Sequence, residues 1–269
     1  MATYLDAILA RHRAAARADE RDPAALIESA RSCPAPRGFA AAIRATTGLA
    51  VVAEVKRRSP SKGDLFADLD AAELARTYAV NGASCLSVLT DVEHFGGSVE
   101  DLVVAREASG LPVLRKDFTV CAADVCDARL MGADCILLIA AALSDDELSS
   151  FGELALDLGL DVLVEVHDED ELDRALATVV SDAGAVGPEV LVGVNQRDLE
   201  TFRVDQDRAV RVAAAIPDHL VRVAESGVRG PEDASALRAA GYDAVLVGEH
   251  LVTAADPAAA LTALRIGDG

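Results

Sequence analysis

The chain has 269 residues, of which 51% are apolar, and carries a formal net charge of −20 at pH 7. This length and apolar content argue against disorder and provide for a large buried core. The acidity argues against nucleic acid and against an anionic membrane as partners, because both are bound through clustered Lys and Arg. A site for an anionic ligand must therefore gather its cations locally.

The chain contains five cysteines and five histidines. An odd number of cysteines without CxxC spacing indicates neither a disulfide framework nor a zinc site. The histidines show no metal-ligand spacing either. Residues 1–17 contain no continuous apolar stretch, so neither a signal peptide nor a transmembrane span is expected. We expect a cytoplasmic protein with reduced thiols and no bound metal.

Residues 1–46 precede the first predicted strand, and the helical spacing of Leu5, Ile8 and Leu9 predicts two or three extra helices there. Eight short apolar runs follow at intervals of roughly 23–34 residues, which is typical of successive β-α units. Their uniform apolarity indicates strands that are covered on both faces. The predicted strands are Val51–Lys56, Cys85–Thr90, Pro112–Asp117, Cys135–Ile139, Val162–His167, Val190–Asn195, Val221–Glu225 and Ala244–Gly248.

Helical segments lie between these strands, and several end in Gly just before the next strand. Eight such units without a long linker predict an α/β protein with a single (βα)8 TIM barrel. The alternative is a doubly wound open sheet, but no GxGxxG motif follows the first strand. The clearest helical segments are Ala71–Asn81, Asp145–Leu158 and Pro231–Ala240.

We assign one domain to residues 1–269, with 1–46 as an N-terminal helical extension and 47–269 as the barrel. The connection around residues 183–189 is unusually long. It leads into the N-terminal end of the sixth strand, so we place it on the bottom face of the barrel, away from the chemistry.

Polar side chains recur near the C-terminal ends of these apolar strands. Glu54 and Lys56 share one face of the first strand, because alternate residues of a strand point the same way. A structural ion pair and a functional pair explain this strand equally well. The repetition on later strands favours function, because the active sites of α/β barrels lie at this face. We therefore predict acid–base chemistry by groups with shifted pKa values. The later residues are Ser87, Lys116, Glu165, Asn195 and Glu225.

The last two β-α units contain Ser226-Gly227 and Gly248-Glu249 directly after their strands. Loops at these places commonly bind phosphate through backbone N–H groups, and Gly permits a close approach. Either Gly alone could be an ordinary turn residue, but as a pair they favour a phosphate site. Residues 57–63 form the most basic stretch of the chain, which suits an anionic ligand, although Ser59 could instead begin a helix.

Five motifs in this order resemble those of indole-3-glycerol-phosphate synthase, an enzyme family of tryptophan biosynthesis. The resemblance extends over roughly residues 4–261, and the five motifs together are much more specific than any one alone. They are AEVKRRSPS at 53–61, LRKDF at 114–118, VEVH at 164–167, VNQRDL at 194–199 and AESG at 224–227.

The resemblance implies a TIM-barrel carbon–carbon carboxy-lyase that requires neither a cofactor nor a metal. Its substrate would be 1-(2-carboxyphenylamino)-1-deoxyribulose 5-phosphate, and its products would be indole-3-glycerol phosphate, carbon dioxide and water. We expect this small phosphorylated substrate to be its partner, and we expect a monomer or a weak dimer.

The matching positions imply catalytic roles. Lys116 would be the general acid that protonates the ketone oxygen of the substrate. Lys56, paired with Glu54, would meet the substrate carboxylate. Glu165 would serve as acid or base in the dehydration, and Asn195 would position intermediates. The division of labour among Glu54, Lys56 and Glu165 stays open.

The resemblance also implies binding roles. Phe118 and Leu138 would wall the anthranilate ring, and the substrate would also be bound by Ser59, Ser87, Arg197 and Glu225. Glu249 departs from the family pattern, in which a small hydroxyl residue is common at this position. Because a carboxylate repels phosphate, we expect the side chain of Glu249 to turn outward. The phosphate site would then consist of Ser226, Gly227, Gly248 and the backbone of Glu249.

Three other functions compete with this interpretation. Phosphoribosylanthranilate isomerase is another phosphate-binding barrel, but its family has a Cys base where this chain has Lys56. A Schiff-base aldolase could use Lys116 or Lys56 as a nucleophile. A barrel without catalysis could be retained for binding, although the complete acid–base set argues against it.

Overall fold

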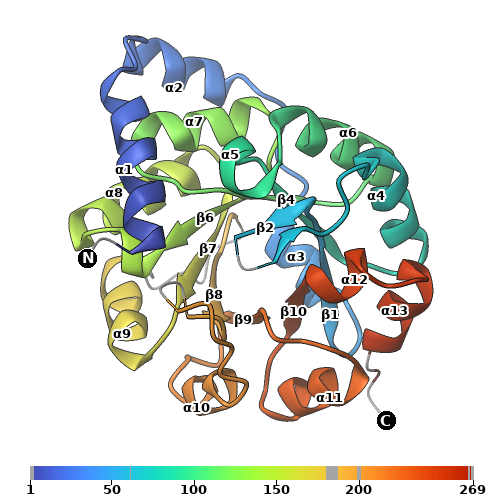
Figure 1. The fold of residues 1–269 in the computed structure, drawn as a ribbon. Helices are drawn as coiled ribbons and strands as arrows, with labels where there is room; N and C mark the ends of the chain where they lie inside the picture. The colour runs from blue at the N-terminus through green and yellow to red at the C-terminus, as the bar shows by residue number, and fades with distance from the viewer. Residues whose placement is uncertain (1–2, 61, 180–186, 199–200, 266, 268–269) are drawn as a thin grey trace.

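The computed structural model describes residues 3–60, 62–179, 187–198, 201–265 and 267. Its centre is a closed barrel of eight parallel strands in the order β1-β10-β9-β8-β7-β6-β5-β4 (Figure 1). The predicted TIM barrel is confirmed, and each strand begins and ends within one residue of its predicted bounds. The strands are β1 (Ala50–Val55), β4 (Cys85–Leu89), β5 (Val113–Lys116), β6 (Cys135–Ile139), β7 (Asp161–Val166), β8 (Val190–Asn195), β9 (Val221–Glu225) and β10 (Ala244–Val247).

Helices surround the barrel (Figure 1). Local sequence sets their ends: in α8, Ser144 and Glu147 each accept a hydrogen bond from the backbone N–H of the other. The predicted helical segments are confirmed as α4 (Ala71–Val80), α8 (Asp145–Asp157) and α11 (Pro231–Ala239). The other outer elements are α5 (Val92–Phe95), α6 (Val99–Ser109), α7 (Ala122–Leu130), η1 (Ala140–Ala142), α9 (Glu169–Thr178), α10 (Arg208–Ala213), α12 (Glu249–Val252) and α13 (Pro257–Leu264).

The alternation of side chains along the strands separates two layers of the core. In β1, Val51, Ala53 and Val55 belong to the layer between strands and helices. Val52 belongs to the layer inside the barrel, and Glu54 lies two residues further on the same face. Every residue of β1 is buried. Whether a strand side chain points into the barrel or towards the helices therefore depends on its odd or even place along the strand.

Three helices precede the barrel, which confirms the predicted N-terminal helices: α1 (Tyr4–Arg17), α2 (Pro23–Arg31) and α3 (Phe39–Arg44). The third helix closes the bottom of the barrel. Its Phe39 and Ile43 are fully buried and belong to the inner core layer. The backbone N–H of Ala40 donates to Asp161 at the beginning of β7, and Arg44 pairs with Glu189 just before β8.

The first helix lies at the opposite end of the barrel. His12 and Arg11 contact Asp91 in the loop after β4. Arg13 forms an ion pair with Glu147 at the beginning of α8, 2.6 Å away, and its guanidinium also donates to the carbonyl of Ala142. The N-terminal extension thus contacts both rims of the barrel.

Two connections differ in how far the structure describes them. After β1 the chain forms a small antiparallel hairpin, β2 (Arg58–Ser59) and β3 (Gly63–Asp64), which the sequence did not predict. Of the connection predicted at 183–189, residues 183–186 lie outside the described residues. Glu189, at its end, lies next to β8 and accepts hydrogen bonds from Arg44, as a bottom-face position requires.

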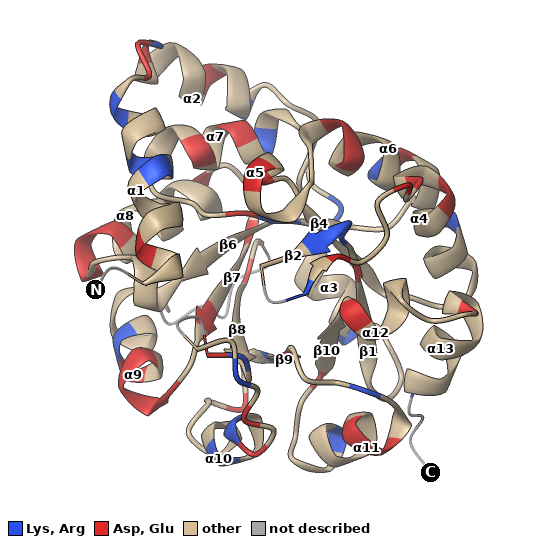
Figure 2. Ribbon diagram, viewed as in Figure 1, with Lys and Arg blue, Asp and Glu red and all other residues tan. Residues whose placement is uncertain are grey.

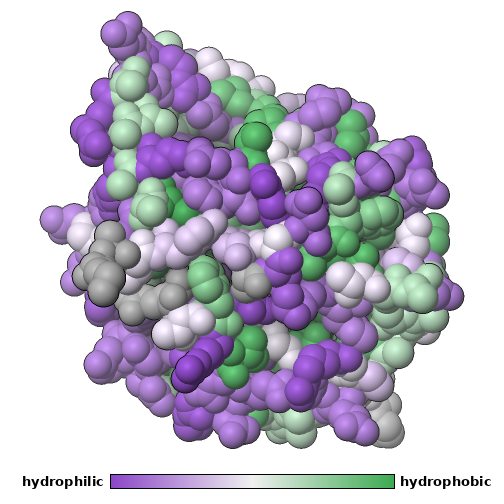
Figure 3. Space-filling view, in the orientation of Figure 1, coloured by the Kyte–Doolittle hydropathy of each residue, from purple (hydrophilic) through white to green (hydrophobic). Residues whose placement is uncertain are grey.

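Charged residues are spread over the outer helices, and acidic residues gather in the first turns of α8 and α9 (Figure 2). On the face shown in Figure 3, hydrophobic residues form small separate groups among hydrophilic ones. Within the described part of the chain, no helix has the length and apolar character needed to cross a bilayer.

Candidate active site

A cavity of about 580 Å³ opens at the C-terminal end of the barrel. All eight barrel strands contribute to its lining. Its polar floor is formed by side chains on the strands, while loops after β1, β8, β9 and β10 form the rim. This is the end at which α/β barrels carry their active sites. The strand residues that line the cavity include Glu54, Leu89, Lys116, Leu137, Ile139, Glu165, Asn195, Glu225, Leu246 and Val247.

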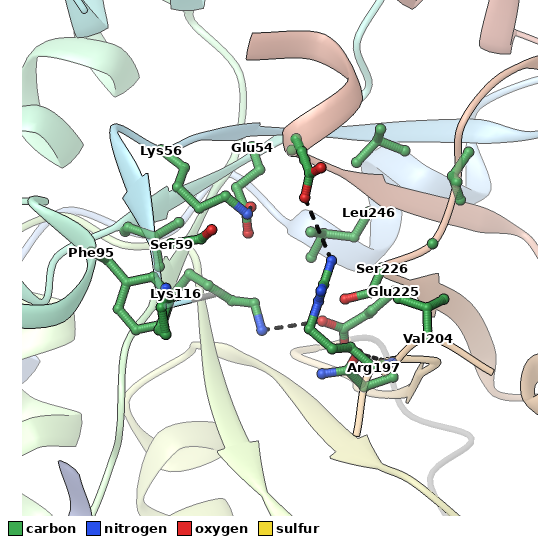
Figure 4. A pocket seen from close by; sticks show the side chains of 18 of the residues that line it. Glu54, Lys56, Ser59, Phe95, Lys116, Arg197, Val204, Glu225, Ser226 and Leu246 are labelled. Carbon is green, nitrogen blue, oxygen red and sulfur yellow. Dashed lines mark hydrogen bonds and ion pairs between the residues drawn. The ribbon is translucent and has the colours of Figure 1, made fainter. Parts of the chain in front are cut away.

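Lys116 lies at the centre of a charged cluster in this cavity (Figure 4). Its Nζ is 2.8 Å from Glu165 Oε2 and 3.2 Å from Glu225 Oε2. Asn195 donates to the other carboxylate oxygen of Glu165, at 3.1 Å. The two glutamates are 1% exposed, so water contributes little to the stabilisation of their charges. The sequence prediction that these strand ends converge is therefore met by the geometry.

The charges of this cluster shift one another's pKa values. Burial by itself lowers the pKa of Lys116, but the charges of Glu165, Glu225 and Glu54 outweigh burial, and the pKa is raised. Burial raises the pKa of Glu165, yet Lys116 and other neighbours lower it overall. Burial and the nearby Glu165 charge raise the pKa of Glu225 despite Lys116. One ammonium group cannot balance two buried carboxylates, so Glu225 retains its proton where Glu165 does not.

Glu54 and Lys56 form a second pair at the end of β1, with 2.5 Å between Oε2 and Nζ. Glu54 is buried, and the side chain of Lys56 is 16% exposed. Two glycines leave space for the carboxylates of the cavity. A Cβ at Gly248 would collide with Glu54, and a Cβ at Gly193 would collide with Glu225. Side chains at these two positions would displace the acid–base groups.

Aromatic and aliphatic side chains form one wall of the cavity. Phe118 and Phe95 lie with their ring centroids 6.4 Å apart, beside Leu89. The predicted contribution of Leu138 is wrong: Leu138 is fully buried in the outer core layer, and Leu137 and Ile139 line the cavity instead. The register explains the error, because Leu138 pairs with Val164 of the outer layer and Ile139 with Glu165.

The predicted serines have different surroundings. Ser59 lines the cavity and is buried, and its Oγ has no hydrogen-bond partner among the described residues. Ser87 pairs in register with Glu54 and so faces the inside of the barrel. However, Ser87 is completely buried and does not reach the cavity lining, because it lies deeper on its strand than Leu89. Its prediction as a substrate contact is therefore not supported by the geometry.

The rim beside β9 and β10 contains the residues predicted to bind phosphate. Ser226, Gly227 and Gly248 all line the cavity. Ser226 and Gly227 both have left-handed backbone conformations, with φ of 64° and 76°. That conformation is costly for Ser, and such strain is concentrated at functional sites.

The side chain of Glu249 does not turn outward, contrary to the prediction. Its carboxylate lies 3.3 Å from Lys62 Nζ and 3.6 Å from Arg197 Nη2, and Glu249 lines the cavity. The attraction of these two cations explains the difference. Arg197 is further held by its backbone N–H, which donates to Asn195, and by the carbonyl of Phe202.

Among the residues that the structure describes, one group at the rim has ligand atoms close enough together to share a cation: His12, Asp91 and Asp117. Both carboxylates are already satisfied by protein groups. Asp91 accepts from Arg11, His12 and the backbone N–H of His94. Asp117 accepts from the Thr90 hydroxyl and from the backbone N–H of Phe118. We interpret this group as the attachment of α1 to the rim.

The sequence model of the indole-3-glycerol phosphate synthase family matches residues 5–264. The chain belongs to this family. An indole-3-glycerol phosphate synthase from Mycolicibacterium vanbaalenii is 49% identical over 265 residues, which cover 98% of this chain and 94% of the relative. One from Streptomyces griseus is 50% identical over 239 residues, which cover 89% and 85%. Membership in the indole-3-glycerol phosphate synthase family makes the chain a carboxy-lyase of tryptophan biosynthesis.

Solved structures of more distant barrels resemble the chain in fold alone. A 3-hexulose-6-phosphate synthase from Salmonella typhimurium has a TM-score of 0.61 at 15% identity, and the match covers 81% of this chain and 97% of that one. A thiamine phosphate pyrophosphorylase from Pyrococcus furiosus has a TM-score of 0.56 at 16% identity, with coverage of 81% and 93%.

Several cavity residues of this indole-3-glycerol phosphate synthase family member were missed by sequence reasoning. Asp117 follows β5 directly and Asp91 is the second residue after β4, so their place after a strand was a usable signal. Gly193 lies between apolar residues of β8, where an isolated Gly often marks a close approach of another group. For Phe95, which is in a four-residue helix, we find no such signal.

Proposed function

We propose that this chain converts 1-(2-carboxyphenylamino)-1-deoxyribulose 5-phosphate into indole-3-glycerol phosphate, carbon dioxide and water. The observation that carries the proposal is the position of Lys116, whose ammonium group faces the cavity between two buried carboxylates. An ammonium held in its charged form there can give a proton to an oxygen that becomes negative during a reaction.

The first step is ring closure. The aromatic carbon that bears the carboxylate attacks the ketone carbon, and Lys116 donates a proton to the ketone oxygen, which becomes a hydroxyl. Loss of the carboxylate as carbon dioxide then leaves its electron pair in the ring and restores aromaticity. Lys56 lines the cavity and can pair with this carboxylate; its Nζ lies 2.5 Å from Glu54 Oε2. The apolar wall around Phe118 and Ile139 packs against the aromatic ring.

Dehydration follows, in which the new hydroxyl leaves as water and a proton leaves the neighbouring carbon. Glu165 is ionised and buried, and once Lys116 has given its proton to the substrate, the charge that lowers the pKa of Glu165 is gone, so this carboxylate can accept the proton. Asn195 fixes the orientation of Glu165 by its hydrogen bond. Glu225, with its raised pKa, keeps the cluster from carrying a second negative charge.

The phosphate of the substrate binds at the rim in this proposal. Ser226, Gly227, Gly248 and the backbone of Glu249 supply the loop positions, and Ser59 supplies a buried hydroxyl without a partner among the described residues. Arg197 adds a cation at the same rim. The distance between this rim and the lysine cluster is spanned by one continuous cavity, so a single ligand can contact both.

We further propose that residues 1–269 act as one domain in the cytoplasm, as a monomer or a weak dimer. The contacts of α1 with the top rim and of α3 with the bottom support one cooperative unit. The net charge of −20 supports the absence of nucleic acid and anionic membranes as partners.

The test is an assay of the purified protein with the carboxyphenylamino substrate. We expect indole absorbance and fluorescence to appear, with one carbon dioxide released for each indole formed. Turnover of phosphoribosylanthranilate instead would indicate an isomerase. A lysine adduct trapped by borohydride would indicate an aldolase, and ligand binding without turnover would indicate a binding protein. Any of these three results would contradict the proposal.

A further inference from the structure

The cations that line the cavity each have an acidic partner among the described residues. Lys56 pairs with Glu54, Lys116 with Glu165 and Glu225, and Arg229 with Asp233. Lys62 and Arg197 share one acid, Glu249. An anionic ligand that enters this cavity must therefore compete with a carboxylate for whichever cation it contacts.

Glu249 differs from the other acids of the cavity in its exposure. The side chains of Glu54, Glu165 and Glu225 are 6% exposed or less, whereas that of Glu249 is 35% exposed. The partners of Glu249 are also accessible, with Lys62 57% and Arg197 24% exposed. Its two ion pairs are the longest of these contacts, at 3.3 and 3.6 Å. Glu249 can thus leave its partners for water at low cost, which the buried acids cannot do.

We propose that Glu249 is a counter-ion that the substrate displaces: it neutralises Lys62 and Arg197 in the free enzyme and moves away when a phosphate dianion takes its place. The inference rests on the function proposed above, in which the phosphate binds at this rim. A phosphate group carries about −1.5 to −2 charges at neutral pH, so it is repelled by a carboxylate that stays and attracted by cations that are released.

The consequence is selection against small anions. Displacement of Glu249 lowers the affinity for every phosphate-containing ligand by the same factor. A substrate that also contacts Lys56 and the aromatic wall binds in spite of this loss. Inorganic phosphate has no such additional contacts, so Glu249 keeps the rim free of it.

The decisive variant is Glu249→Gln, which keeps the shape of the side chain and removes its charge. Partly exposed ion pairs are individually weak, so we expect inorganic phosphate to bind about three- to tenfold more tightly to the variant. Binding is measured by calorimetry and by the rise in Tm at increasing phosphate, and neither measurement requires turnover. If the proposed reaction is also present, the KM for the substrate falls in the variant.

A matched control is Glu232→Gln, which removes the same charge from the exposed first turn of α11, outside the cavity lining. We expect its affinity for phosphate to equal that of the wild type. A coupling test adds Lys62→Met. Lys62→Met weakens phosphate binding more in the Glu249→Gln background than in the wild type, because in the wild type the gain from Lys62 is reduced by the loss of its ion pair with Glu249.

Unchanged or weaker phosphate binding in Glu249→Gln would overturn the inference, as would equal tightening in Glu232→Gln or additive effects in the coupling test. Failure of the proposed function has a different signature. In that case the wild type does not form indole, whereas the phosphate measurements still decide the role of Glu249.

Discussion

Buried carboxylates lie at both ends of the barrel, but their partners differ. At the bottom, Asp134 is fully buried and accepts hydrogen bonds from the backbone N–H groups of Arg37 and Val113 and from the side chain of Arg106. Asp161 accepts from the backbone N–H groups of Ala40 and Glu189. These carboxylates connect the N-terminal extension to the strands, and their partners are mostly groups that cannot titrate.

At the top, Glu165 and Glu225 interact with the ionisable Lys116, and Glu225 Oε1 has no hydrogen-bond partner in the described part of the chain. These groups also face a cavity, whereas Asp134 does not. Burial of charge is therefore no sufficient sign of catalysis. A buried carboxylate bound by backbone N–H groups holds the fold, while one balanced by a titratable neighbour next to a cavity can exchange protons.

The largest effect predicted by this comparison concerns Lys116→Met at the top. We expect kcat/KM to fall about a thousandfold, because the general acid is lost. The far-UV spectrum and cooperative unfolding should be kept, since both glutamates can take up protons when the ammonium group is removed. Indole formation and thermal unfolding measure the two properties. Near-wild-type turnover would show that Lys116 is not the acid.

A methyl group at Gly193 tests whether the space for Glu225 is needed. Gly193→Ala places a Cβ where the Glu225 carboxylate lies. We expect a loss of about a hundredfold in kcat/KM, because small displacements of catalytic groups are costly. Gly187→Ala is the bottom-face control, because a Cβ there meets nothing within 4 Å. If both variants had the same activity, the positions of the top carboxylates would not matter.

At the bottom of the barrel, Asp134→Asn should lower stability and leave activity unchanged, which is the reverse of the effect expected for Lys116→Met. The amide cannot neutralise Arg106, and one of its two sides presents a donor to the donors that surround it. We expect the free energy of unfolding to fall by about 2–4 kcal/mol, with KM and kcat unchanged at temperatures where the variant is folded. Urea unfolding and the indole assay measure these quantities. A selective loss of kcat without loss of stability would contradict the distinction between the two ends.

The smallest effect concerns the pH dependence of stability. The pKa of Glu225 is raised in the folded protein, so the folded state holds this proton after the unfolded chain has released it. Wild-type stability therefore loses the contribution of this group as pH rises from about 4.5 towards the raised value. Glu225→Gln has a neutral side chain at every pH, so its Tm should change less with pH over that range. Equal slopes in both proteins would mean that Glu225 is ionised at neutral pH.

The sequence was sufficient to predict the barrel and most of the acid–base cluster. Apolar runs that follow a Gly at the end of a helix indicated the strands. Polar residues at the strand ends then indicated which alternate side chains of β1, β5, β7, β8 and β9 point into the barrel. In β6 all five residues are apolar, so no side chain indicated which face is inside. The family resemblance implied that Leu138 lines the cavity, and no residue of β6 spoke against it; the pairing with β7 shows that this was wrong.

The rim was harder to predict, because its contacts join distant segments. Glu249 was expected to avoid the site on the grounds of repulsion, but its direction is set by Lys62 and Arg197, which come from two other loops. The depth of Ser87 depends on the stagger between neighbouring strands, which the sequence does not show. In each case the missing information was a long-range distance rather than a local preference.

The attachment of α1 has a consequence for the order in which the molecule is completed. Its Arg11 contacts a residue 80 positions later in the chain, and its Arg13 one that is 134 positions later. During synthesis the first helix is made long before either contact residue exists. The helix that borders the cavity therefore reaches its last contact only after a further 134 residues have been made, and the cavity itself is completed later still, when β10 and Gly248 are available.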